Sequence, residues 1–140
     1  LAAEALLEAL PRVLAATSQP EPQREALATL APKIVKSEAR LDWREPALAL
    51  ERRVRAFDPW PVAETHLRDG RRLRVFEATV IPAERSAPPG TIVAAGRAGI
   101  DVATGDGVLR LLKIQPPSGR VMDAEAYLAA HSLSGAEFVA

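Results

Sequence analysis

The side chains of this sequence best suited to chemistry are basic ones gathered in its middle. Residues 31–80 hold eleven lysines and arginines against eight acids, whereas residues 1–30 hold two against four and residues 81–140 hold five against six. The three segments therefore carry +3, −2 and −1, which sum to a formal charge of zero. A basic segment in a neutral chain indicates either a surface for a polyanion such as a nucleic acid or a solvated, arginine-rich face.

Catalytic and metal chemistry has little support in the sequence. There is no cysteine, which excludes disulfides and thiolate ligands, and the two histidines, His66 and His131, lie far apart without a matching carboxylate cluster. Asp106 lies between two glycines, as turn residues commonly do, and no second acid or histidine accompanies it. We therefore expect no metal site and structural roles for these three side chains.

The hydropathy of the sequence and the residues at its start bear on the cellular location of the protein. No apolar run approaches the roughly 20 residues of a membrane span, and the start does not resemble a signal peptide. These features predict a soluble, cytoplasmic protein with no membrane partner. The sequence also begins with a leucine inside an expected helix, which suggests a piece of a longer protein.

A corner built from two prolines organises the expected elements. Helical apolar spacing over residues 45–57 leads into it, and Pro59 and Pro61 each remove a backbone donor and restrict the residue before them, so the helix must end there. Trp60 between the prolines is expected to be a buried anchor that fixes how the helix enters the sheet. The corner residues with an expected structural role are Phe57, Pro59, Trp60 and Pro61.

Before this corner, the sequence predicts a helix, a linker and a strap. Residues 1–16 have an apolar stripe at helical spacing, interrupted by Pro11, and residues 17–23 alternate prolines with polar side chains. Residues 24–42 are polar and basic, and we expect them to lie on the surface with a short extended piece at residues 33–36.

After the corner, the pattern changes to short strands separated by glycine-containing turns. A loop is expected over residues 83–89, a helix over residues 124–130 with Asp123 as its N-cap, and a tail held down by Phe138. The glycines at 96 and 99 resemble a phosphate-clamping loop, but they lie between strands and therefore predict a hairpin turn. Strands are expected over residues 62–67, 73–81, 91–94, 100–104 and 108–115.

Five such strands favour a mainly β fold with helices: a small antiparallel, OB-like or Greek-key β-barrel preceded by helices. Barrels that bind single strands use aromatic side chains for stacking, but the expected strands offer only Phe76. Any nucleic-acid contact is therefore expected to go mainly to phosphates.

Four segments of the sequence together form a recognisable pattern: residues 33–43 (KIVKSEARLDW), residues 51–61 ending in RAFDPWP, residues 87–92 ending in PGTI, and residues 102–122, which contain VATGDG, QP and GRVM. In their order and spacing, these segments resemble the C-terminal part of the methionyl-tRNA formyltransferase family. Two departures occur: Asp58 stands where the family usually has asparagine, and Val121 where it has a second basic residue.

The resemblance implies a two-domain enzyme that transfers a formyl group from 10-formyltetrahydrofolate to the amino group of initiator methionyl-tRNA. Residues 1–30 would be the last helix of an upstream, Rossmann-like catalytic domain plus a linker, and residues 31–140 the C-terminal, OB-like, tRNA-binding domain. The family's catalytic residues and formyl-folate pocket belong to the upstream domain and match no position here. This part alone is therefore expected to lack catalytic residues, cofactor and activity.

The resemblance, together with the basic middle, implies a surface that grips tRNA by its phosphates. An alternative is the C-terminal domain of a sugar-nucleotide or folate formyltransferase, serving as a structural or dimerisation module. The residues expected to contact tRNA are Lys33, Lys36, Arg52, Arg53, Arg55, Lys113 and Arg120.

Overall fold

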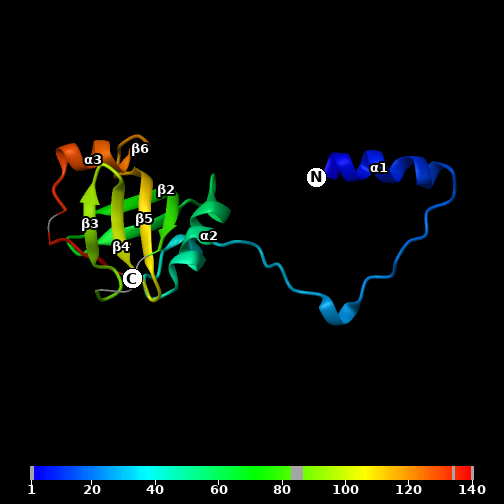
Figure 1. Cartoon of the computed structure of the whole chain (residues 1–140), viewed down its shortest axis with the longest axis horizontal. Helices are drawn as coiled ribbons and strands as arrows, with labels where there is room; N and C mark the ends of the chain where they lie inside the picture. Colours follow the sequence, from blue (N-terminus) through cyan, green and yellow to red (C-terminus); the bar gives the residue numbers. More distant parts are fainter. Residues whose placement is uncertain (1, 83–86, 134, 140) are drawn as a thin grey trace. The chain divides into compact units, whose positions relative to one another are not determined.

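The computed structural model describes residues 2–82, 87–133 and 135–139, in two compact units, Leu1–Lys33 and Ile34–Ala140. The first unit contains α1 (Ala2–Leu14) and a single 3-10 turn, η1 (Glu25–Leu27) (Figure 1). The helix expected at the start is confirmed over its described residues, with Pro11 inside it. Neither element buries a side chain.

The second unit is a curled antiparallel sheet with helices beside it (Figure 1). Its strands follow the order β3-β4-β5-β2-β1-β7, and β6 pairs with β5. Its elements are η2 (Lys36–Ala39), α2 (Ala47–Phe57), β1 (Ala63–Leu67), β2 (Arg72–Ile81), β3 (Ile92–Gly96), β4 (Gly99–Ala103), β5 (Val108–Gln115), β6 (Met122–Asp123), α3 (Ala124–Ala130) and β7 (Phe138–Val139).

The five expected strands are all present, and the OB-like fold is confirmed. The sheet curls until its two outer strands meet: Thr91, just before β3, bridges Glu137, just before β7. The Phe138 N–H donates to the Gly90 carbonyl at 2.8 Å beside this bridge. Of the loop expected over residues 83–89, positions 83–86 lie outside the described residues.

The start of α2 is fixed by a turn of the sheet. The N–H of Ala47 donates to the Asp106 carbonyl at 2.9 Å, and the N–H of Gly105 donates to the Trp43 carbonyl at 2.9 Å. A Cβ on Gly105 would lie 1.8 Å from the Arg44 carbonyl oxygen, so only glycine allows this approach. Asp106 is therefore a turn residue, as predicted, and its backbone oxygen holds the helix.

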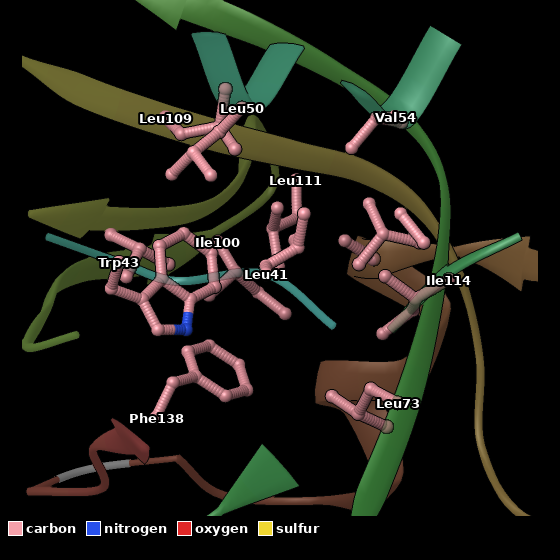
Figure 2. Close-up of a cluster of buried hydrophobic side chains, with 14 of the residues drawn as sticks. Leu41, Trp43, Leu50, Val54, Leu73, Ile100, Leu109, Leu111, Ile114 and Phe138 are labelled. Carbon is pink, nitrogen blue, oxygen red and sulfur yellow. The ribbon is translucent and has the colours of Figure 1, made fainter. Parts of the chain in front are cut away.

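The core lies inside the curled sheet and includes Trp43, which Figure 2 shows among the leucines and isoleucines of the cluster. The Trp43 ring stacks on Phe138 with a centroid distance of 5.4 Å, and its Nε1 donates to Thr65 Oγ1 at 2.9 Å. Phe138 thus holds the C-terminal tail, as predicted. The expectation that residues 24–42 form a surface strap is wrong at its end, because Ala39 and Leu41 are buried against the sheet.

The helix at the end of the chain is confirmed, with a different capping arrangement. Asp123 occupies the N-cap position of α3, but its side chain makes no capping hydrogen bond. His131 follows the helix and stacks on Tyr127, with ring centroids 4.3 Å apart, which supports its predicted structural role.

Candidate nucleic-acid interface

Most of the basic residues expected to contact tRNA are exposed, and those of the second unit lie on several of its elements. Lys33 ends the first unit, and Lys36 begins η2 in the second. Three of the others lie on α2, one on β5 and one in the loop after β5. Whether each cation is available to a phosphate depends on the carboxylates that already contact it.

On α2, carboxylates already hold two of the three arginines. Arg53 contacts Glu45 at 2.8 Å, and Arg55 contacts Glu51 at 3.6 Å, the i,i+4 pair that the sequence predicts. Arg52 is exposed and has no ion-pair partner among the described residues. A phosphate would have to compete with Glu45 for Arg53, whereas Arg52 is available.

Lys113 on β5 lies between two acids. Its Nζ is 2.9 Å from Glu77 Oε2, and Asp123 is opposite it on β6. The hydrogen bond that Lys113 donates to Glu77, together with the negative charges of Glu77 and Asp123, raises the pKa of Lys113. Its charge is thereby balanced within the protein, which makes it a weaker phosphate ligand than its position in the sequence suggests.

Arg55 and Lys113 nevertheless lie near each other. Arg55, Phe76 and Glu77 line one shallow hollow between α2 and β2, and Glu77 and Lys113 line the next. Glu77 therefore separates the two cations. This part of the surface has mixed charge.

Arg120 lies in the loop between β5 and β6. The loop is held by Gln115, whose Nε2 donates to the Gly119 carbonyl at 2.8 Å. Arg120 itself is exposed and has no partner among residues 2–82, 87–133 and 135–139. Together with Arg52 and Lys36, it remains free for an external anion.

The expectation that Trp60 is a buried anchor is wrong. The helix ends at Phe57, as the prolines predict, and the Val62 N–H donates back to the Phe57 carbonyl at 2.9 Å. This tight return turns Pro61 and Val62 inward and leaves Trp60 59% exposed. Phe57 is buried beside them, while the core tryptophan is Trp43, which sequence reasoning did not single out.

Sequence reasoning also missed basic residues on the outer side of β2. Arg72 and Arg74 alternate with the buried Leu73 and Val75, so both point away from the core. The alternation of arginine and apolar residues was the signal that could have identified them. They face His66 and Glu64 on β1.

Within the described residues, no group of three or more histidine and acidic side chains is placed to hold a metal ion. Among the helices that the structure describes, none is long and apolar enough to cross a membrane.

Two relatives of this chain carry the same name, methionyl-tRNA formyltransferase. The methionyl-tRNA formyltransferase of Methylococcus capsulatus is 51% identical over 135 residues, which is 96% of this chain and 43% of that protein. The methionyl-tRNA formyltransferase of Nitrosococcus oceani is 51% identical over 139 residues, 96% of this chain and 42% of that protein. The chain thus spans about two fifths of the length of these relatives.

Solved structures share the fold at lower identity. A variant of HypX from Aquifex aeolicus superposes with a TM-score of 0.66 and 23% identity, over 96% of this chain and 24% of that chain. The same protein in complex with tetrahydrofolic acid gives a TM-score of 0.63 and 24% identity, over 89% of this chain and 22% of that chain.

The domain family described as "Formyl transferase, C-terminal domain" matches residues 33–132, which include α2 and the strands from β1 to β6. This match covers most of the second unit and all four sequence segments that carry the resemblance. The chain therefore belongs to the formyl transferase C-terminal domain family.

Proposed function

We propose that this chain is the tRNA-holding part of a methionyl-tRNA formyltransferase. The observation that carries the proposal is 51% identity to two methionyl-tRNA formyltransferases over 96% of the chain. In such an enzyme, 10-formyltetrahydrofolate donates the formyl group to the amino group of initiator methionyl-tRNA. The cytoplasm, where translation begins, is the proposed location.

The proposed division of labour places the reaction in an upstream, Rossmann-like domain. Residues 1–30 would be the last helix of that domain and a linker. The exposed apolar side chains of α1, such as Leu7 and Leu14, support this part of the proposal, because a catalytic domain would supply the apolar cover that they lack.

In this proposal, the second unit contributes by positioning. Gripping the phosphates of the tRNA body would hold the aminoacyl end in the active site, and such positioning lowers a reaction barrier substantially. The strongest contributors among the seven expected residues are those for which no carboxylate competes among the described residues: Lys33, Lys36, Arg52 and Arg120. A phosphate could bind the other three, Arg53, Arg55 and Lys113, only by displacing the carboxylate that each already contacts.

The test is an electrophoretic mobility shift of initiator tRNA at two salt concentrations, about 50 and about 200 mM, with a non-initiator tRNA as control. We expect binding that weakens steeply with salt and discriminates little between the tRNAs, since phosphates carry no sequence information. Affinity that stayed flat with salt would contradict a phosphate grip.

The alternative function, a structural or dimerisation module, predicts a different result. Unchanged tRNA affinity after alanine replacement of Arg52, Arg53 and Arg120 would favour that role. Failure of the whole enzyme to bind tRNA would favour a sugar-nucleotide or folate substrate.

A further inference from the structure

The outer face of β1, β2 and β5 carries a row of polar side chains outside the set expected from the sequence. Glu64 on β1 lies opposite Arg74 on β2, and Arg74 lies opposite Gln115 on β5. His66 and Arg72 form the next pair along β1 and β2. Their neighbours on each strand point into the core, so these five side chains share the outer face.

The arginine at the centre of this face lacks the partner that most other arginines of the second unit have. Arg44, Arg53, Arg68 and Arg110, for example, each contact a carboxylate within 3 Å. The Nε of Arg74 is buried and has no hydrogen-bond partner among the described residues. A buried donor without a partner is costly, so an incoming acceptor that orders this guanidinium would recover part of that cost.

The acid opposite Arg74 is already shared with Arg72. Glu64 Oε2 contacts Arg72 NH1 at 3.4 Å and is directly opposite Arg74 in register. Two guanidinium groups therefore face one carboxylate, which leaves an excess of one positive charge. His66 adds a second buried nitrogen, its ring atom Nδ1, without a hydrogen-bond partner in the part of the chain that the structure describes.

The loop after β5 extends the same face. Gln115, opposite Arg74, holds the loop through Gly119, and the exposed Arg120 is the next residue. Arg120 has no ion-pair partner among the described residues and was itself expected to contact tRNA. A residue from the predicted set thus follows directly after the glycine that Gln115 holds.

We propose that Arg74, flanked by His66 and Arg72 on the sheet and by Arg120 in the loop, binds a backbone phosphate of tRNA. This inference rests on the proposed function and names the part of the surface that performs it. The planar fork of a guanidinium donates two parallel hydrogen bonds to a phosphate, which a lysine cannot reproduce. The grip on tRNA is then centred on the sheet, away from the carboxylate-paired arginines of α2.

The experiment measures the affinity of the whole chain for initiator tRNA at about 50 and about 200 mM salt. The variant is Arg74→Gln, and the matched control is Arg97→Gln, which removes the same charge from a side chain that is 95% exposed in the β3–β4 turn. We expect Arg74→Gln to weaken binding about tenfold and to lower the salt slope by about one. Arg97→Gln should stay within about twofold of the unaltered chain.

Two further measurements separate a binding role from a structural one. Arg74→Lys keeps the charge but loses the fork, so it should fall between the unaltered chain and Arg74→Gln. In the unaltered chain, the Arg74 Nε–H resonance should shift when tRNA is added. A shift would support the proposal even if Arg74→Gln lowered the thermal midpoint.

The outcomes distinguish this inference from the proposed function. If the unaltered chain binds tRNA with steep salt dependence while Arg74→Gln binds like Arg97→Gln, the phosphate site is overturned and the tRNA-holding function stands. An Arg74 resonance that tRNA leaves unmoved would also overturn the site. If the unaltered chain binds no tRNA at either salt concentration, both proposals fail.

Discussion

Two helices of this chain have the same kind of sequence pattern and opposite surroundings. The helix α1 has leucines and a valine at helical spacing, yet Leu6, Leu7 and Leu14 are all exposed. The helix α2 has a comparable stripe, and its Leu50 and Val54 are buried in the core (Figure 2). The pattern therefore identifies a face that can be covered, and the rest of the molecule decides whether it is.

The apolar face of α2 is covered because of the segment that precedes the helix and the turn that contacts its first residue. The segment before it places Leu41 and Trp43 in the core, and the turn at Gly105 fixes its first residue. Among the described residues of the first unit, neither α1 nor η1 buries a side chain. The following predictions test this contrast, beginning with the largest effect.

The most damaging change should be at the turn that seats α2. Gly105→Ala would place a Cβ 1.8 Å from the Arg44 carbonyl oxygen, so we expect a loss of more than about 3 kcal/mol in the free energy of unfolding, or failure to fold. Gly96→Ala is the control, because its Cβ would meet nothing within 4 Å. Equal denaturant midpoints for the two variants would show that the turn does not hold the helix.

Truncating the buried stripe of α2 should cost slightly less. Leu50→Ala removes a fully buried side chain and leaves a cavity, for which we expect a loss of about 2–5 kcal/mol in chemical denaturation. A loss below about 1 kcal/mol would mean that α2 is no better covered than an exposed helix.

The hydrogen bond between Trp43 and Thr65 should contribute a smaller share. Trp43→Phe leaves the Thr65 hydroxyl buried without this donor, and we expect it to cost about 1–3 kcal/mol. Adding Thr65→Val should cost less in the Trp43→Phe background than in the unaltered chain, because the donor is already gone. Additive losses in this double-mutant cycle would contradict a direct interaction.

The ion pair that precedes α2 should give a small, pH-dependent effect. Hydrogen bonds from Arg44 lower the pKa of Asp42 to about 2, so the folded state holds the ionised form more strongly than the unfolded state does. The stabilisation is therefore fully present above the ordinary pKa of the carboxyl and is lost as the pH falls through about 2. Solvent screening keeps it below about 1 kcal/mol, since Arg44 is 76% exposed.

The measurement is the unfolding free energy of Asp42→Asn and of the unaltered chain between pH 2 and pH 7. We expect the difference in unfolding free energy between the two proteins to shrink as the pH falls. A difference that grew toward pH 2 would contradict the assignment.

The smallest effect should come from the exposed stripe. Leu10→Ala on α1 should change the unfolding of the second unit by less than about 0.5 kcal/mol, because α1 buries no side chain. A loss as large as that of Leu50→Ala would show that α1 is covered in solution and would remove the contrast between the helices.

Much of the fold was predictable because its signals are local. The five strands follow from alternation and glycine turns, and the end of α2 follows from Pro59 and Pro61. Which tryptophan is buried was not predictable, because Trp43 is covered by Thr65 and Phe138, which are distant in sequence. The exposure of Trp60 follows from the tight return between Phe57 and Val62, which turns Pro61 and Val62 inward.

For the candidate site, the sequence predicts which residues are basic but not which of them are paired with carboxylates. Basic residues can be located in a sequence, but their carboxylate partners are visible there only for helical neighbours such as Glu51 and Arg55. The pairing of Lys113 with Glu77 depends on strand register, and so does the position of Arg74 opposite Gln115. Strand register is set by the folded sheet as a whole.

The meeting of Trp43 with Phe138 has a consequence for how the protein is made. These two rings lie near opposite ends of the second unit in sequence, and the bridge that joins the outer strands also uses a residue next to Phe138. The barrel therefore cannot close until Phe138 has emerged from the ribosome. During synthesis, α2 and the first strands must wait with their apolar faces uncovered, so this domain is expected to depend on a slow, late folding step and on chaperones that shield nascent chains.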